Sequence, residues 1–152
     1  MDRAALGSLL LQLAGTGGMV GVIWFVQMVH YPLFAEVPEA GFQAYEQAHV
    51  RRTGTLVGPL MLMELAAAIW LLVRTPIGVP EWMPWAGLVV LALLWGSTFF
   101  VQVPLHRQLE AGFNLEAIER LVATNWLRTV GWTLRGGLAV WMLLRAVDGI
   151  DR

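Results

Sequence analysis

The chain has 152 residues, of which 57% are hydrophobic and 14% are charged, and its formal net charge is −1. Soluble domains average about 25% charged residues, so this composition excludes an ordinary soluble domain. The lack of a positive excess excludes nucleic acid as a partner. The sequence contains no Cys, which excludes disulfides and thiolate chemistry.

Four apolar runs predict four membrane-spanning helices. A hydrocarbon core about 30 Å thick requires about 20 apolar residues at a rise of about 1.5 Å each. The first run is too long for a cleaved signal peptide. We therefore expect one all-α domain, a four-helix bundle in a lipid bilayer, with spans at about 9–31, 56–73, 85–103 and 123–144.

Two polar segments, 34–52 and 105–122, connect the spans and are predicted to contain short helices. In the first, apolar and aromatic positions recur at helical spacing up to His49. In the second, Asn114 is placed to cap a helix. Each segment follows an odd-numbered span, so both lie on one membrane face, which we call side B. The opposite face is side A. The arginines outside the spans divide equally between the two faces, so the orientation stays open.

The two halves of the chain, about 1–76 and 77–152, suggest a parallel duplication of a helix pair. At a shift of 76 residues His30 falls on His106, and His49 falls on Asn125. Each half would be a span, a side-B helix and a second span, related by an axis along the membrane normal. The polar positions alone carry this pattern, and at the same shift Arg52 falls on Arg128.

All three histidines of the chain are predicted to lie on side B. Ionisable residues are costly in a membrane and usually face its protein interior. His30, His49 and His106, with Glu46, would form a ligand set for Fe, Cu or Zn. Alternatively, His30 and His106 would clamp a haem, or the histidines would only bond interfacial groups. A substrate pocket on the same side, with or without a metal, would use Gln27, Arg52, Gln102, Asn125 and Arg128.

Glu64 and Arg135 are predicted to lie near the middle of the second and fourth spans. A lone charge at that depth costs several kcal/mol, so we expect the two to pair and to lock the spans together. A proton relay or an anion site using Arg128 and Arg135 is the functional alternative. The Gly-rich first span would allow close helix contacts, as small residues do in membranes.

Two motifs resemble a known group of proteins. They are Val103-Pro104-Leu105-His106-Arg107-Gln108-Leu109 and Asn125-Trp126-Leu127-Arg128-Thr129, the latter followed by Trp132 and Arg135. The pattern is similar to that of small four-helix bacterial membrane proteins grouped with anthrone-oxygenase-like proteins. The resemblance covers about the C-terminal third of the chain. It implies a four-helix fold in the inner (cytoplasmic) membrane of a bacterium.

Three functions are compatible with these features. The first is a metal- or haem-binding oxidoreductase acting on a lipophilic small molecule. The second is a structural or assembly subunit of a membrane complex, which the Gly-rich face of the first span would fit. The third is a small carrier, which would require a homo-oligomer. The side-A halves of the first and third spans offer no polar face, which counts against a carrier.

Overall fold

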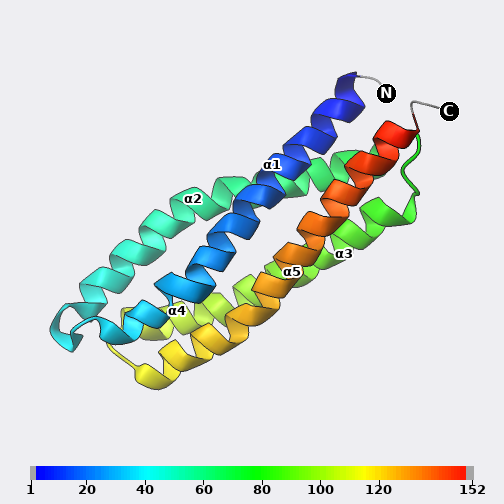
Figure 1. The fold of residues 1–152 in the computed structure, drawn as a ribbon. Helices are drawn as coiled ribbons and strands as arrows, with labels where there is room; N and C mark the ends of the chain where they lie inside the picture. Colours follow the sequence, from blue (N-terminus) through cyan, green and yellow to red (C-terminus); the bar gives the residue numbers. More distant parts are fainter. Residues whose placement is uncertain (1–2, 150–152) are drawn as a thin grey trace.

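The computed structural model describes residues 3–149, except for the side chain of Arg3 (Figure 1). Of these residues 89% are helical and none forms a strand, which confirms the all-α fold. The elements, in order, are α1 (Arg3–Phe25), the π-helix η1 (Val26–His30), the 3-10 helix η2 (Pro32–Glu36), α2 (Glu39–Val73), α3 (Trp82–Ser97), the π-helix η3 (Thr98–Gln102), α4 (Val103–Glu110) and α5 (Leu115–Asp148).

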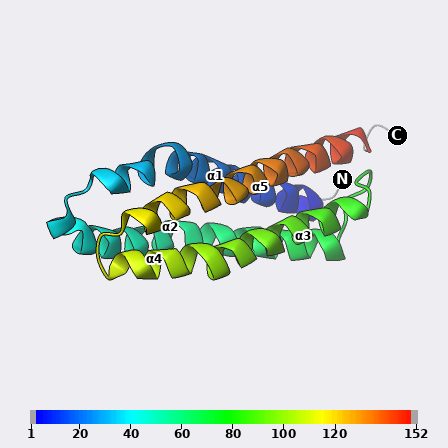
Figure 2. The ribbon, with the colours of Figure 1, turned by 90° about the horizontal axis from the view of Figure 1, so that it is seen from below.

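Four long helical segments run side by side along the bundle (Figures 1 and 2). Within the described residues three are long and apolar enough to cross a membrane: Ala4–Glu36, Glu39–Val73 and Trp82–Glu110. The fourth, α5, is about 50 Å long at 1.5 Å per residue, but its interior arginines lower its hydropathy. It packs against α1 and α3, so it belongs to the same bundle.

The outer surface of the bundle is apolar, as a lipid environment requires. Phe100 is 83% exposed, and Val73, Leu93 and Leu134 are also exposed. Inside, three apolar clusters follow one another along the axis. Phe34, Phe42 and Leu109 belong to the side-B cluster. Met19, Leu94 and Trp132 belong to the middle one, and Leu9, Leu71 and Met142 to the last.

The second predicted span and the connector before it form one continuous helix, α2. The sequence predicted a separate side-B helix before a span at 56–73, but the ladder continues through Pro59. Pro is tolerated within membrane helices because neighbouring groups satisfy the freed backbone carbonyl. In the other connector, the Asn114 side chain accepts a hydrogen bond from the backbone N–H of Ala117 at 3.0 Å, which confirms the predicted N-cap of α5.

Both odd-numbered spans end in a π-helical turn followed by a proline. Residues 26–30 and 98–102 are offset by 72, as are Pro32 and Pro104. Proline clashes with the carbonyl four residues before it, which favours a widened turn at that place. By contrast, α2 and α5 start 76 residues apart, at Glu39 and Leu115. His30 therefore corresponds to Gln102 and not to His106, because the second half contains one extra helical turn before α5.

Candidate metal centre

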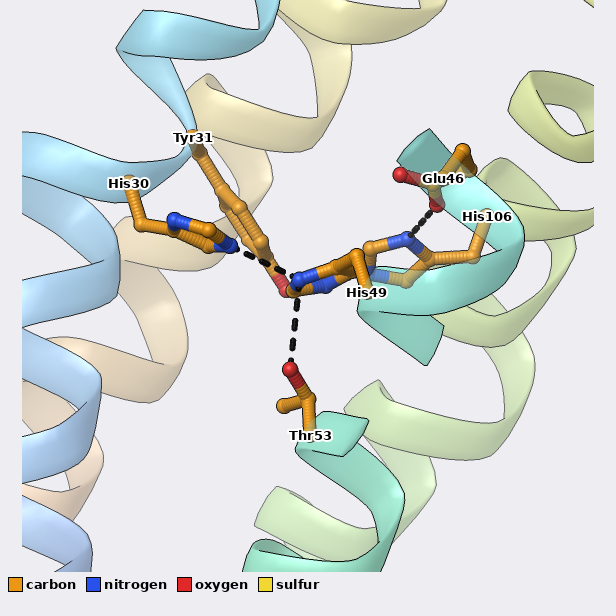
Figure 3. A network of polar contacts seen from close by, with 6 residues as sticks. All are labelled: His30, Tyr31, Glu46, His49, Thr53 and His106. Carbon is orange, nitrogen blue, oxygen red and sulfur yellow. Dashed lines mark hydrogen bonds and ion pairs between the residues drawn. The ribbon is translucent and has the colours of Figure 1, made fainter. Parts of the chain in front are cut away.

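The three histidines lie in one connected group at the side-B end of the bundle (Figure 3). His30 ends η1, His49 lies on α2 and His106 lies on α4. Nε2 of His30 is 2.7 Å from Nδ1 of His49. The rings of His49 and His106 stack with centroids 5.2 Å apart. The structure thus brings together residues that are up to 76 positions apart in the sequence.

Local helix geometry explains how each side chain reaches the group. Glu46, His49 and Thr53 are spaced at i, i+3 and i+7 on α2, so they share one helix face. The π-turn η1 presents His30 and the neighbouring Tyr31 to the same space (Figure 3). Glu46 is fully buried and His49 is 7% exposed. A buried carboxylate next to two imidazoles is a group of ligands that suits a metal ion, both in chemical type and in position.

Hydrogen bonds fix the ring of His106 from both sides. Its Nδ1 lies 2.5 Å from Oε1 of Glu46, and because a carboxylate only accepts, this nitrogen is the donor. With a ring proton on Nδ1 alone, Nε2 accepts from the hydroxyl of Tyr31 at 3.0 Å. The structure therefore defines a Tyr31–His106–Glu46 chain, in which each member orients the next.

His49 makes both of its hydrogen-bond contacts through one ring nitrogen. Nδ1 contacts Nε2 of His30 and, at 3.2 Å, Oγ1 of Thr53. Its other nitrogen takes part in neither contact. A ligating histidine usually bonds an outer group through the nitrogen that does not hold the metal. His30 and Thr53 are placed to be that outer group for His49, as Tyr31 is for His106.

One set of donor atoms in the described chain has the spacing of a metal site. Ligand atoms of Glu46, His49 and His106 all lie within 4.8 Å of one another. His30 is not part of that set. Oε2 of Glu46 is buried and has no hydrogen-bond partner, so one carboxylate oxygen is unused. Two imidazoles and one carboxylate fit a transition metal such as Fe or Zn, with small inward movements to reach bonds of about 2.0–2.2 Å.

A haem clamped by His30 and His106 does not fit this arrangement. The ring of His49 stands between the two other rings, with centroids 4.7 Å from His30 and 5.2 Å from His106 (Figure 3). Phe34 also packs against His30 and His49. A flat macrocycle cannot enter between rings in direct contact.

Comparisons with known proteins do not identify the chain. No protein-family model, no curated protein and no solved structure matches it. The similarity to anthrone-oxygenase-like proteins therefore stays a prediction. The description of the site depends on geometry alone.

Four of the five predicted substrate residues lie in buried hydrogen-bond networks at the same end of the bundle as the three histidines. The amide of Asn125 donates to Oε1 of Gln27 at 3.0 Å and accepts from Arg128 at 3.1 Å. Gln102 donates to Oγ1 of Thr124 at 3.0 Å. Arg52, by contrast, is exposed at the surface. The repeat equates Arg52 with Arg128, but Arg128 is buried whereas Arg52 is exposed.

A second polar centre lies deeper in the bundle and joins all four long helices. Nε of Arg135 on α5 donates to Oε2 of Glu64 on α2 at 2.6 Å, and both side chains are fully buried. Thr16 on α1 donates to the other oxygen of Glu64 in a short hydrogen bond. Arg135 also donates to the backbone carbonyl of Gly87 on α3. We call this centre the Glu64–Arg135 lock.

Sequence reasoning missed Tyr31, Thr53 and Thr16. Tyr31 lies directly between His30 and a proline, which is a signal that could have drawn attention to it. Thr53 follows His49 by one helical turn. Thr16 is neutral and lies in a Gly-rich run, so nothing in the sequence distinguishes it. The side-A half of α1 also buries Ser8, Gln12 and Thr16, contrary to the expectation that this half offers no polar face.

Proposed function

We propose that this protein is a metal-dependent membrane enzyme, an oxidoreductase that acts on a lipophilic small molecule. The observation that carries the proposal is the ligand set of Glu46, His49 and His106 within 4.8 Å. Two histidines and one carboxylate leave coordination positions open for a substrate, and this donor set is typical of non-haem iron and of catalytic zinc. Iron is the metal that fits an oxidoreductase, since bound iron would supply one-electron chemistry.

The chain's own residues would hold and orient the ion. Glu46 would supply negative charge through the carboxylate oxygen that now lacks a partner. Tyr31 would keep the ring of His106 in place, and His30 with Thr53 would do the same for His49. Such outer partners raise ligand basicity and typically change metal affinity about 10–100-fold. In this proposal His30 supports a ligand and is not itself one.

The position of His30 supports a substrate that arrives through the bilayer. His30 is partly exposed, and the exposed ring of Phe25 stacks on it at a centroid distance of 6.0 Å. Met28 and Leu33, on either side of this turn, are exposed apolar residues. The cluster therefore borders an apolar outer surface at His30. We place the protein in the inner membrane of a bacterium, on the strength of its apolar helices and the resemblance of its C-terminal third.

Metal content of the detergent-purified protein, measured by mass spectrometry, tests the proposal. We expect near-stoichiometric Fe, or Zn in its place, in the wild type and in His30→Ala. His49→Ala and His106→Ala are expected to lose it while keeping the helical circular dichroism spectrum. A wild-type protein that remains metal-free after reconstitution with Fe(II) and Zn(II) would refute the metal centre. Retention of metal by the folded His49→Ala and His106→Ala variants would place the ion elsewhere.

The second candidate is a subunit that acts by assembly with another copy of itself. Gly7, Gly17 and Gly21 lie exposed on α1, and a Cβ added at Gly17 or Gly21 would meet no atom within 4 Å. Small residues on a lipid-facing helix allow a second helix to approach closely. A carrier is less favoured, because Met19, Ile23 and Trp132 separate the polar side chains of the lock from those on side B.

A further inference from the structure

Two buried arginines of α5 differ in how their charge is balanced. Arg135 is 1% exposed and pairs with Glu64. Arg128 lies seven residues earlier on the same face of the helix and is 6% exposed. In the part of the chain that the structure describes, no carboxylate lies within ion-pair distance of Arg128. An unpaired charge that is buried among membrane helices costs several kcal/mol. This position therefore calls for a negative group that the chain does not supply.

The guanidinium of Arg128 is held in place but not saturated. One terminal nitrogen donates to Oδ1 of Asn125 at 3.1 Å, and that amide is itself fixed by Gln27. The Nε of Arg128 is buried and has no partner. Arg128 is also hydrogen-bonded to the side chain of Tyr31, whose hydroxyl contacts the candidate ligand His106. A rigid cation with an unused donor thus lies one side chain away from the metal set.

From these observations we infer that Arg128 binds an oxyanion carried on an apolar tail. The guanidinium fork fits carboxylate and phosphate oxygens, which it holds by charge-assisted hydrogen bonds. The apolar tail follows from the exposed apolar side chains next to Arg128 on α5, which are Trp126, Leu127 and Val130. The assignment of this anion as the substrate rests on the proposed enzyme function. The binding of the anion to Arg128 does not depend on that function. Fatty carboxylates and anionic lipid headgroups share this chemistry, and the experiment separates them.

Thermal unfolding in an uncharged detergent, after removal of metal with EDTA, tests the inference independently of the metal centre. The probes are oleate, oleyl alcohol and dioleoyl phosphatidic acid. We expect oleate to stabilise the wild type and the control Arg120→Gln, which changes an exposed arginine of the same helix, and we expect oleyl alcohol to have no effect. Arg128→Gln should weaken the apparent affinity for oleate at least about tenfold, since a charge-assisted hydrogen bond is lost.

A second variant keeps the test decisive if Arg128→Gln does not fold. Asn125→Asp places a carboxylate where the amide oxygen now contacts Arg128, so it should also weaken oleate binding about tenfold. Equal stabilisation by oleate in wild type and a folded variant, or equal stabilisation by the alcohol, would overturn the site. Stabilisation by phosphatidic acid alone would support an oxyanion site but overturn its assignment to the substrate.

Discussion

Helix α2 contains two fully buried glutamates whose surroundings differ in one respect. Glu64 uses both carboxylate oxygens, one toward Thr16 and one toward Arg135. Glu46 uses only one, toward His106, and its second oxygen has no partner. Both carboxylates are buried on the same helix, yet Glu64 is bonded to a permanent cation and Glu46 to a histidine ring.

Under the proposed function, this difference separates a structural centre from the metal-binding one. A carboxylate that is fully bonded to a guanidinium has no capacity left for a ligand, and disturbing it strands a buried charge. A carboxylate that has a free oxygen and accepts a hydrogen bond from a histidine can bind a metal ion, which replaces the proton of that hydrogen bond. We therefore expect changes at Glu64 to act on stability and changes at Glu46 to act on metal binding.

The largest effect is expected from Glu64→Gln. The substitution keeps the shape of the side chain but leaves Arg135 buried without a counter-charge. Breaking such a pair from one side costs about 3–5 kcal/mol. The measurement is the free energy of unfolding in mixed micelles. The double variant Glu64→Leu with Arg135→Met serves as the control, since it removes both charges and should recover most of the loss.

If Glu64→Gln proved as stable as the wild type, the lock would not hold the helices together. If the double variant were as unstable as the single one, packing around Arg135 would matter more than its charge. Either result would weaken the contrast between the two glutamates.

Glu46→Gln is expected to abolish metal binding with little effect on the metal-free fold. An amide oxygen can still accept from Nδ1 of His106, so the loss of unfolding free energy should stay within about 1.5 kcal/mol. A metal at 100 times its Kd stabilises the wild type by about 2.7 kcal/mol through linkage. Metal titrations followed by thermal unfolding should show this increment in wild type only. A large destabilisation of metal-free Glu46→Gln would instead make Glu46 a second lock.

Tyr31→Phe probes the outer support of the metal set. The ring packing against Phe34, at a centroid distance of 5.4 Å, is kept, and only the hydroxyl that contacts His106 is lost. We expect metal affinity to fall about tenfold with unchanged stoichiometry, as for an outer-shell partner. Competition with a chromophoric chelator measures it. Complete loss of metal would make Tyr31 a ligand itself.

The sequence was sufficient for the fold and for the approximate location of the cluster, because both depend on run length and on topology. The length of apolar runs indicates how many helices can cross a membrane. The pairing of Glu64 with Arg135 could be anticipated because no other opposite charge lies at that depth. Helix rotation could not be anticipated, so Arg52 was expected inside although it is exposed. The π-turns, which align His30 with Gln102 and present Tyr31, arise from proline sterics that no hydrophobic pattern records.

The smallest effects separate two glycines of α1 that lie two positions apart. A Cβ at Gly15 would lie 3.1 Å from Oε1 of Glu64 and 3.0 Å from the methyl of Met63, so Gly15→Ala should push on the lock and cost about 1 kcal/mol. A Cβ at Gly17 would meet nothing within 4 Å, and Gly17→Ala should raise stability by up to about 1 kcal/mol through helix propensity. Unfolding in micelles compares the two. A clear loss for Gly17→Ala, accompanied by a smaller particle in size-exclusion chromatography, would mean that another copy of the chain contacts this face, and would favour assembly over catalysis.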